Sequence, residues 1–379
     1  MKYRVGVIGG GQLARMMTVP AINLGIELKV LAEAKNSSAN LATTVVGDYT
    51  DLKTVMDFAK SVDVITFDHE HVPLSILQAL EAEGISVQPS SKALAHAQNK
   101  LVMRRALEAI GAPSPRWLAV SSSSELDGFI AEYGPEVIVK TPIGGYDGKG
   151  VRIVTSSLEV SDWFDHSVLA SLGGELLVEE KVAFKRELAQ LSARNPSGEF
   201  KAWPVVETRQ KNGVCSEVLA PAPNTSGELV ATAMEIAKLI SSSLAVTGNL
   251  AVEMFETSDG KLLVNELAMR PHNSGHFSIE GSTTSQFEQH LRAVLDLPLG
   301  DTSVPEASVM VNLLGVSNEI DFVDNYAELM RSFASAKLHS YGKSPRIGRK
   351  LGHITVIGKT HESALATALE ARAAILGVH

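Results

Sequence analysis

Short apolar runs alternate with helix-like patterns along the first hundred residues. The apolar runs that predict buried strands are residues 5–8, 28–31, 44–46, 62–67 and 85–87. The stretches between them carry apolar residues at the 3.6-residue period of a helix, notably residues 12–24, 51–61 and 73–83. Strands that alternate with helices in this way predict an α/β fold, a parallel sheet with helices on both faces.

A different order of elements begins near Lys100. A helical period over residues 101–110 ends at Gly111 and Pro113. Further strands are predicted at residues 137–140, 150–154, 176–179, 189–193 and 201–207, the last two being antiparallel and joined by a turn at residues 195–198. A helix over residues 228–244, a hairpin centred on Asp259-Gly260, and short strands before an Ala-rich helix at residues 361–375 complete the pattern. The whole chain is therefore expected to be α+β, with a Rossmann-like parallel sheet first and a small mixed α/β domain last.

Composition narrows the class of protein. The chain has 379 residues, enough for two or three domains, and its net charge of −9 disfavours a general nucleic-acid binder, which is usually basic. The one cysteine, Cys215, excludes an internal disulfide, and we expect a small apolar residue of a strand rather than a nucleophile. The N-terminus lacks the apolar region of a signal peptide and no apolar run is long enough for a membrane span. We therefore expect a cytoplasmic protein with neither nucleic acid nor membrane as a partner.

A lysine followed by a glycine-rich run carries the strongest chemical signal. Lys140 ends an apolar strand, and residues 144–150 read Gly-Gly-Tyr-Asp-Gly-Lys-Gly. A lysine at a strand end can direct its ammonium group at a polyphosphate, and glycines let backbone N–H groups close over the same phosphates. The order differs from the P-loop motif, so a Walker site is excluded. A flexible surface loop is the alternative reading.

The hairpin at Asp259-Gly260 brings two carboxylates together. If these two residues form the centre of a type I′ turn, Glu253 faces Glu266 on one side of the sheet. A three-residue turn would instead place Asn265 opposite Glu253. Like charges in such a pair call for compensation, and Mg²⁺ prefers carboxylates together with substrate phosphates. Two solvated glutamates are the alternative, but their apolar neighbours favour a partly buried site.

Three further runs carry candidate chemistry. Residues 9–14 match G-x-G-x-x-[GA] after a strand, and Glu33 lies where a ribose-binding acid would follow, so a dinucleotide site is an alternative. Residues 270–276 (RPHNSGH) form a loop rich in hydrogen-bond donors that suits a small anion. A late basic cluster lies beside a predicted strand at residues 354–357 and consists of Arg346, Arg349, Lys350 and His353.

Together these motifs resemble the ATP-grasp superfamily and, more narrowly, the 5-(carboxyamino)imidazole ribonucleotide synthase family. The resemblance covers nearly the whole chain and rests on residues 9–16, 66–72, 144–150, 185–188, 265–276 and 348–353. It implies an ATP-grasp fold with an N-terminal Rossmann-like domain at residues 1–98, an ATP-grasp domain at residues 99–297 and a small C-terminal domain at residues 298–379. The glycine loop would belong to a lid subdomain at about residues 115–180.

The resemblance also implies a nucleotide site. Lys100 and Lys140 would contact the ATP phosphates, Glu187 would bind the ribose, and Glu253 and Glu266 would hold Mg²⁺ with Asn265 close by. The mobile loop over the phosphates would comprise Gly145, Tyr146, Asp147, Gly148, Lys149 and Gly150, and Val151 would also bind ATP. The hinge against adenine would comprise Glu179, Glu180, Lys181 and Val182.

The second substrate would lie beside the nucleotide. Gly10, Gly11, Gln12 and Leu13 would bind the phosphate of aminoimidazole ribonucleotide, and Glu70 its ribose. The residues expected around the aminoimidazole and bicarbonate are Asp147, Arg270, His272, Asn273, Ser274, Arg349 and Lys350, of which Asp147, Arg270, His272 and Lys350 are the catalytic candidates.

The implied reaction is an ATP-dependent carboxylation with bicarbonate as co-substrate, carried out by a homodimer. Carboxyphosphate forms first, and the amine of the ribonucleotide captures it or the CO₂ released from it. The chain departs from the family pattern at Ala14, at Asp68-His69 and at Gln210, which makes Gln210 a doubtful ATP ligand. The alternatives are another ATP-grasp ligase with a phosphoribosyl substrate, such as a formate-using transformylase, an NAD-dependent oxidoreductase using residues 9–14 and Glu33, and a non-catalytic nucleotide-binding module.

Overall fold

The N-terminal segment folds into the parallel sheet that its alternating pattern predicts. The computed structural model describes residues 3–145, 150–319 and 322–377. The parallel strands lie in the order β3-β2-β1-β4, and their bounds are Arg4–Ile8 (β1), Glu27–Ala32 (β2), Thr43–Val46 (β3) and Val64–Phe67 (β4). The strand predicted at residues 85–87 is reduced to one bridge between Val87 and Ile65, because Pro89 and the start of a helix at Ser91 end the extended segment.

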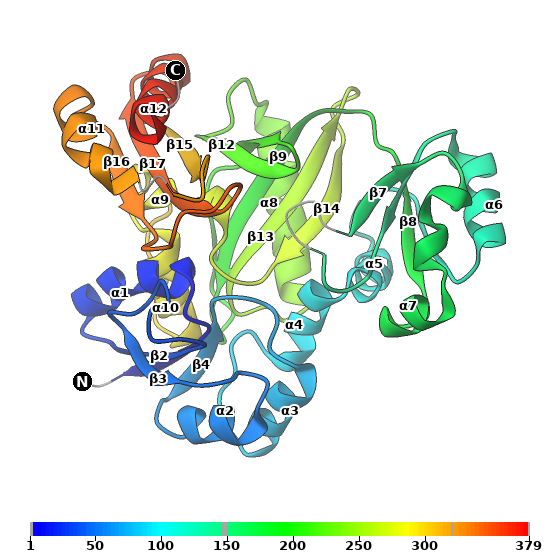
Figure 1. Cartoon of the computed structure of the whole chain (residues 1–379), viewed down its shortest axis with the longest axis horizontal. Coiled ribbons are helices and arrows are strands. Elements are labelled where there is room, and N and C mark those ends of the chain that lie inside the picture. Colours follow the sequence, from blue (N-terminus) through cyan, green and yellow to red (C-terminus); the bar gives the residue numbers. More distant parts are fainter. Residues whose placement is uncertain (1–2, 146–149, 320–321, 378–379) are drawn as a thin grey trace.

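Helices cover both faces of this sheet, as expected. The helices of the first 110 residues are α1 (Gln12–Leu24), α2 (Leu52–Ala59), α3 (Leu74–Ala82), α4 (Ser91–Gln98) and α5 (Lys100–Ala109). Successive residues of β1 point to opposite faces of the sheet. Val7 packs with α1 on one face, whereas Ile8 packs on the other in the core that holds α2 and α3. The carboxyl ends of β1 and β4 are therefore left open at one edge of the sheet, where α1 begins (Figure 1).

A small antiparallel sheet forms a separate lobe, seen on the right of Figure 1. Its strands follow the order β5-β8-β6-β7, with bounds Trp117–Val120 (β5), Val137–Lys140 (β6), Val151–Val154 (β7) and Leu176–Glu180 (β8). It carries α6 (Ser123–Tyr133), a 3₁₀ segment at Ser157–Trp163 and α7 (His166–Ser171). We call this lobe the lid subdomain, and it has an apolar core of its own around Val139 and Val178.

One long antiparallel sheet runs through the rest of the chain. Its order is β14-β13-β9-β11-β12-β15-β17-β16, with β10 paired to β9. The strands before residue 300 are Phe184–Arg194 (β9), Phe200–Ala202 (β10), Val206–Lys211 (β11), Val214–Ala220 (β12), Gly248–Thr257 (β13) and Leu262–Ala268 (β14). The predicted antiparallel pairing around residues 195–198 is confirmed as β9 with β10, but the second predicted strand, residues 201–207, is divided between β10 and β11, which both pair with β9. Cys215 lies within β12. The helices of this part are α8 (Gly227–Ser243), α9 (Ser278–Gly281) and α10 (Gln286–Val294).

The C-terminal strands extend the same sheet. Val311 of β15 (Ala307–Leu314) pairs with Glu217 of β12, and β17 (Lys350–Gly358) and β16 (Lys337–Ser340) follow. The helix α12 (His361–Leu376) packs on β15 and β17, and α11 (Tyr326–Ser332) packs on α12. The C-terminal strands therefore stand above the open edge of the N-terminal sheet (Figure 1). Among the described residues, no helix is both long and apolar enough to cross a membrane.

Candidate functional site

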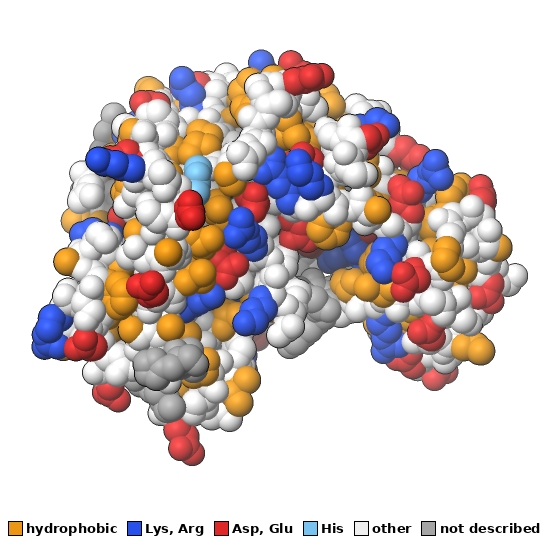
Figure 2. Space-filling model, turned by 90° about the horizontal axis from the view of Figure 1, so that it is seen from above, with side chains coloured by type: hydrophobic (Ala, Val, Ile, Leu, Met, Phe, Trp, Pro, Cys, Tyr) orange, Lys and Arg blue, Asp and Glu red, His pale blue; other side chains and the backbone are white. Residues whose placement is uncertain are grey.

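Two lysines from different lobes meet at the junction of the lid subdomain with the long sheet. Lys140 ends β6, and its Nζ lies 2.6 Å from Oε2 of Glu179 and donates to Oδ1 of Asn265 at 3.2 Å. Lys100 is the first residue of α5, a helix capped by the Asn99 side chain, and its Nζ lies 3.3 Å from Oε1 of Glu266. Each lysine side chain is only 13% exposed, so both lysines lie at the floor of a cleft. Figure 2 shows the surface hollowed between this lobe and the rest of the chain, with basic and acidic side chains at its border.

The two carboxylates of the hairpin face each other as predicted, although the route differs. Glu253 pairs with Glu266, but Thr257 and Lys261 close the hairpin, so the turn has three residues rather than two. Gly260 adopts a φ of +79°, the left-handed conformation that such a turn requires. A bulge then adds one residue to β14, because Met254 pairs with Val264 while Glu253 pairs with Glu266. The bulge shifts the register back, and Asn265 is the extra residue.

The bulge explains why two consecutive side chains of β14 reach the cleft. In a regular strand, neighbouring residues point to opposite faces, and a bulge re-aims one of them. Asn265 and Glu266 both contact cleft lysines, at 3.2 and 3.3 Å. The amide oxygen of Asn265 therefore lies beside the Glu253–Glu266 pair.

The electrostatics of this pair favour a cation. Burial, followed by the charge of Glu266, raises the pKa of Glu253 to about 8, although 28% of its side chain remains open to solvent. No group of three or more His, Cys, Asp and Glu side chains in the described residues is arranged to hold a metal ion. Two carboxylates and an amide oxygen fit Mg²⁺ only if other oxygen ligands complete its shell, as substrate phosphates do.

The loop after β14 places the predicted small-anion residues close to the carboxylates. His272 Nε2 lies 3.4 Å from Oε1 of Glu253, and burial, followed by the charge of Arg270, lowers the pKa of His272 to about 3. Glu70 is not free for a ligand, because it accepts from the Met269 backbone at 2.8 Å and pairs with Arg270 at 3.1 Å. Lys350 begins β17, and its charge lowers the pKa of both Glu253 and His272.

The neighbouring Asn273 and Ser274 turn their side chains towards the protein. Asn273 exchanges two hydrogen bonds with Asn312, at 3.0 and 2.6 Å. The Ser274 hydroxyl lies 2.8 Å from Nδ1 of His272 and is nearly fully buried. In this arrangement both residues order the loop around His272.

The expected hinge and ribose residues flank the cleft on the lid side. Glu179 is buried, with 3% of its side chain exposed, and it pairs with Arg104 and Lys140. Glu180 accepts from the Arg116 backbone and Lys181 pairs with Glu136, so these side chains hold the lid together. Val182 is the second residue after β8, and Val151 begins β7.

Glu187 lies on β9 in register with Phe255, on the same face as Glu253 two residues along β13. Burial raises its pKa, and a hydrogen bond from Gln210 opposes this shift. Gln210 therefore contacts the expected ribose-binding residue, and its own contact with ATP stays a prediction.

Four residues of the predicted loop lie outside the described residues: Tyr146, Asp147, Gly148 and Lys149. The two ends of the loop are described. The carbonyl oxygen of Gly145 accepts from Lys100 at 3.5 Å, and the carbonyl oxygen of Gly150 accepts from the Thr141 backbone at 2.9 Å. Both ends of the loop therefore lie beside the cleft lysines.

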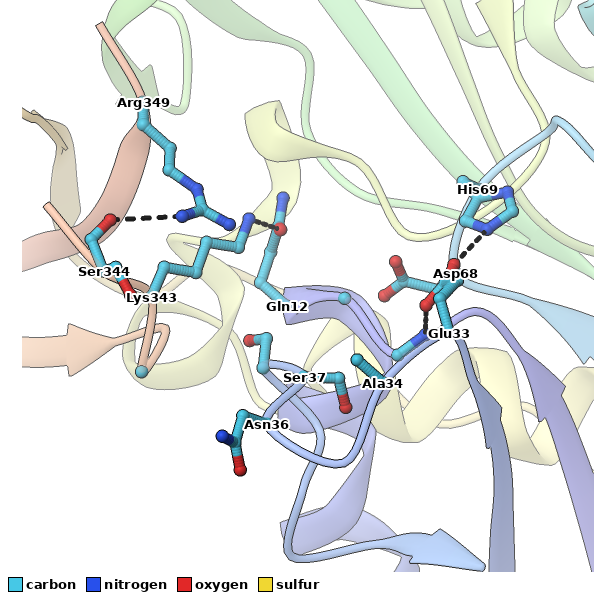
Figure 3. A pocket seen from close by; sticks show the side chains of 14 residues that line it. Gln12, Glu33, Ala34, Asn36, Ser37, Asp68, His69, Lys343, Ser344 and Arg349 are labelled. Atoms are coloured by element: carbon cyan, nitrogen blue, oxygen red, sulfur yellow. Dashed lines mark hydrogen bonds and ion pairs between the residues drawn. The ribbon is translucent and has the colours of Figure 1, made fainter. Parts of the chain in front are cut away.

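A second cavity of about 430 Å³ lies between the N-terminal sheet and the C-terminal strands. Figure 3 shows Lys343 and Arg349 reaching over it from the C-terminal side, towards Gln12 at the start of α1. Lys343 Nζ donates to Oε1 of Gln12 at 2.5 Å, and Arg349 donates to the Ser344 carbonyl at 3.1 Å. Gly10 and Gly11 line the cavity, whereas Leu13 is buried in the core below it. Backbone N–H groups and two cations suit a phosphate.

The acids at this cavity are already engaged. Glu33 accepts from the Gly10 backbone at 3.2 Å and lies 3.2 Å from His69, whose hydrogen bond lowers the pKa of Glu33 to about 2. Asp68 accepts from the Ala14 backbone at 2.8 Å, and burial raises its pKa. A Cβ on Gly11 would lie 1.9 Å from Oδ2 of Asp68, so a glycine is required there.

Two charged residues missed in the sequence contact the predicted site residues, Lys343 at the second cavity and Arg104 behind the cleft. Lys343 follows Gly342, whose φ of +61° turns the chain towards α1, and the Tyr-Gly-Lys run was the available signal. Arg104 is fully buried and bonds Glu179, but it lies in an ordinary helical pattern beside Arg105. No local feature distinguishes the two arginines before the fold is known.

Three family descriptions match successive parts of the chain. Residues 1–98 match the ribonucleotide synthetase preATP-grasp domain, residues 105–287 the ATP-grasp domain, and residues 308–367 the phosphoribosylaminoimidazole carboxylase C-terminal domain. The chain is 48% identical over 359 residues to the N5-carboxyaminoimidazole ribonucleotide synthase of Mycobacterium tuberculosis, a match that covers 93% of this chain and 83% of the relative.

Solved structures agree over the full length. The N5-carboxyaminoimidazole ribonucleotide synthetase of Thermus thermophilus superposes with a TM-score of 0.87 at 34% identity, covering 99% of each chain. The Aspergillus clavatus enzyme, solved with ADP and 5-aminoimidazole ribonucleotide, has a TM-score of 0.88 at 32% identity and the same coverage. These similarities extend over both cavities and all three sheets. The chain belongs to the N5-carboxyaminoimidazole ribonucleotide synthase family of ATP-grasp enzymes.

Proposed function

We propose that the protein carboxylates the exocyclic amine of 5-aminoimidazole ribonucleotide with bicarbonate, at the expense of ATP. The observation that carries this proposal is a lysine–carboxylate cleft beside a cavity of about 430 Å³, linked through one ion pair: Arg270, on the loop that reaches Glu253, pairs at 3.1 Å with Glu70, which follows the cavity residue His69. The cleft suits Mg·ATP, and the cavity suits the phosphate of the ribonucleotide. An NAD-dependent oxidoreductase is disfavoured because Glu33 is bonded to Gly10 and His69.

The cleft gives the nucleotide an orientation. Lys100 and Lys140 would neutralise the phosphates, and Glu253, Glu266 and Asn265 would hold Mg²⁺ against them. When bound, Mg²⁺ would offset the negative charge on the transferring phosphoryl group. Glu187 pairs with Phe255, which is two residues after Glu253 on β13. It therefore lies about 7 Å along the strand from the proposed metal site, a separation that suits a ribose beside the phosphates.

The chemistry that these residues support has two steps. A bicarbonate oxygen attacks the γ-phosphorus, the bond to the ADP oxygen breaks, and carboxyphosphate forms. The amine nitrogen then attacks the carboxyl carbon of carboxyphosphate and displaces phosphate, or carboxyphosphate first breaks into CO₂ and phosphate and the amine attacks the CO₂. On either route the amine gives up one proton, which leaves with the phosphate as hydrogen phosphate. Arg270 and His272 would hold the bicarbonate and the developing charge, which is supported by the position of His272 3.4 Å from Glu253. The charge of Lys350 lowers the pKa of the same carboxylate, Glu253. Asp147 stays a prediction, because it lies outside the described residues.

The second cavity would hold the ribonucleotide. Gly10, Gly11 and Gln12 offer the start of α1 to its phosphate, and Lys343 and Arg349 add charge. Glu70 would accept the ribose hydroxyls only after exchanging its bonds to Met269 and Arg270. That exchange would free the Arg270 guanidinium for bicarbonate when the second substrate arrives.

The decisive assay measures ADP release by the purified protein with each substrate omitted in turn. We expect turnover to require ATP, Mg²⁺, bicarbonate and 5-aminoimidazole ribonucleotide together. Glu266→Ala should abolish that turnover while the circular-dichroism spectrum and the thermal midpoint stay close to those of the wild type. Wild-type ADP release by this variant would refute the metal assignment, and a requirement for NAD would refute the function. We also propose a homodimer, which light scattering on the purified protein tests.

A further inference from the structure

We infer that Arg104 is a positioning residue of the nucleotide site, which shapes the bulge of β14 and thereby aims Glu266 and Asn265 at the cleft. This inference rests on the proposed nucleotide and metal site. Arg104 lies on α5, one turn after Lys100, and its side chain is fully buried.

The guanidinium group makes one hydrogen bond to each of three partners. Its Nε donates to Oε1 of Glu179 at 2.5 Å. Its Nη1 and Nη2 donate to the carbonyl oxygens of Val264 and Asn265, both at 2.8 Å. The planar fork of an arginine can satisfy these acceptors in one fixed geometry, which the single ammonium group of a lysine cannot.

Two of these partners are the residues of the bulge itself. The Val264 backbone N–H, on the free edge of β14, donates to the Pro113 carbonyl at 2.8 Å. The backbone of the bulge is therefore anchored to Arg104 and to the segment just after α5. Without this anchor β14 can recover a regular ladder, in which consecutive residues point to opposite faces. Either Asn265 or Glu266 would then turn away from the cleft.

The third partner connects the bulge to the lid subdomain. Glu179 on β8 accepts from Arg104 and pairs with Lys140 at 2.6 Å, and Lys140 donates to the Asn265 side chain. Arg104, Glu179, Lys140 and Asn265 thus form a closed ring across the cleft floor. Lys140 and Arg104 together hold the pKa of Glu179 below its usual value despite burial. The ring fixes the direction of the Lys140 ammonium group with respect to the metal carboxylates.

The adjacent arginine provides a matched control. Arg105 is on the same helix and also pairs with a glutamate of the lid subdomain, Glu175, at 2.7 Å. That pair is exposed, with 53% of the arginine and 39% of the glutamate side chain open to solvent, so it contributes little to the stability of the protein. Arg105→Lys therefore makes the same substitution on the same helix, at a contact with the same subdomain, but leaves the contacts of the bulge unchanged.

The test compares ADP binding with and without Mg²⁺ by calorimetry in wild type, Arg104→Lys and Arg105→Lys. In Arg104→Lys we expect the gain in ADP affinity that Mg²⁺ confers to fall about tenfold or more, as when a metal ligand loses its orienting partner. Arg105→Lys should keep the full gain. The KM for Mg²⁺ should rise in Arg104→Lys by a similar factor, whereas the KM for 5-aminoimidazole ribonucleotide should stay near the wild-type value.

Glu179→Gln separates the two parts of the ring and serves if Arg104→Lys does not fold. It leaves both arginine–carbonyl bonds in place but removes the charge that holds Lys140. We expect ADP affinity to fall about equally with and without Mg²⁺, about tenfold, because a phosphate cation is misplaced while the carboxylates are not.

Three results would overturn the inference. If Arg104→Lys keeps the full gain in ADP affinity that Mg²⁺ confers, the inference is wrong even though the proposed metal site stands. The same holds if Glu179→Gln loses that gain selectively. A wild-type protein that binds ADP equally well with and without Mg²⁺ would overturn the proposed metal site, and this inference with it.

Discussion

Lys100 and Glu266 form an ion pair at 3.3 Å, so an expected phosphate ligand neutralises an expected metal ligand. The cleft therefore carries its own counter-charges before any nucleotide is present. Mg·ATP binding would exchange this contact for two new ones, lysine with phosphate and carboxylate with metal.

Lys100→Met should weaken nucleotide binding more than it weakens the fold. The change removes an expected phosphate cation and takes from Glu266 its ion-pair partner. We expect the Kd for ADP with Mg²⁺, measured by calorimetry, to rise at least about tenfold, the range for loss of one charge-assisted contact. Lys53→Met is the control, because that lysine forms an exposed pair with Asp57 on α2. An unchanged Kd would show that Lys100 does not meet the phosphates.

Glu253 predicts a coupling between protons and the metal. Burial and Glu266 raise its pKa to about 8, well above the value of about 4.3 for a free glutamate, so near neutral pH the folded protein holds a proton here that the unfolded chain has lost. Stability should therefore fall as the pH rises from about 4 to 8, and binding of ADP with Mg²⁺ at pH 7 should release a proton. Calorimetry in two buffers with different ionisation enthalpies measures that release.

Glu253→Gln provides the matching stability test. The variant lacks the titrating group, so without ligand its free energy of unfolding should exceed that of the wild type by about 1 to 3 kcal/mol at pH 8, with the gap closing towards pH 4.5. The estimate allows for the solvent that still reaches the side chain. The variant should also release no proton on binding ADP with Mg²⁺. A gap that does not change with pH would contradict the assigned titration.

The hairpin shows how far the sequence alone could reach. It predicted that Glu253 faces Glu266, and this is confirmed, but through a turn one residue shorter than the real one. The prediction missed both the longer turn and the bulge, and these two errors cancel. The longer turn shifts the register by one residue, and the bulge at Asn265 shifts it back. A turn is set by local residues such as Gly260, whereas the bulge depends on Arg104, which lies 160 residues away from Val264 in the chain. Periodicity along one strand contains no information on such a partner.

The same difference between local patterns and contacts of distant segments explains which other elements were predicted from the sequence. The strands and helices of the first hundred residues follow largely from local alternation. The exceptions are residues 85–87, which form one bridge rather than a strand, and the helix α4 (Ser91–Gln98), which was not predicted. The pairing of β12 with β15, which joins the C-terminal strands to the long sheet, is a contact between distant segments and was not predicted. Lys343 was missed for this reason, since only that arrangement brings it to Gln12.

Lys343→Gln should impair the ribonucleotide site and leave the nucleotide site intact. We expect the KM for 5-aminoimidazole ribonucleotide to rise by about 10- to 100-fold, because a buried charge-assisted contact with phosphate is lost, while the Kd for ADP stays unchanged. Lys337→Gln, at the exposed start of β16, is the control. A parallel change in both constants would show that Lys343 acts on the fold rather than on the substrate.

The pH dependence of this KM provides an independent check. Burial, followed by the charge of Arg349 against the opposing effect of Asp68, lowers the pKa of Lys343 to about 8. The lysine is then charged below pH 8 and loses its charge above it. The KM for the ribonucleotide should rise as the pH passes through 8 in the wild type and should vary much less in Lys343→Gln. An equal rise in both proteins would assign the titration to another group.

The contact between the N-terminal sheet and the long sheet predicts a loss of stability in acid. His290 Nε2 lies 2.7 Å from Oγ1 of Thr66, and its Nδ1 accepts from the Asn249 backbone at 3.1 Å, so the neutral ring donates through Nε2. Protonation would place a hydrogen on Nδ1, against the Asn249 N–H, and burial lowers the pKa of His290 to about 3. The unfolded histidine titrates near 6.5.

Stability should therefore decline as the pH falls from about 6.5 towards 3, because the unfolded chain binds a proton that the folded protein excludes. His290→Gln should be less stable than the wild type at pH 7 by about 1 to 3 kcal/mol, since it leaves buried partners unmatched. The variant should also lose about 2 kcal/mol less than the wild type between pH 6.5 and 5, so that the two proteins converge in acid. Urea midpoints at several pH values measure this, with the exposed His166→Gln as control. Parallel curves for wild type and His290→Gln would show that His290 is not the group that senses acid.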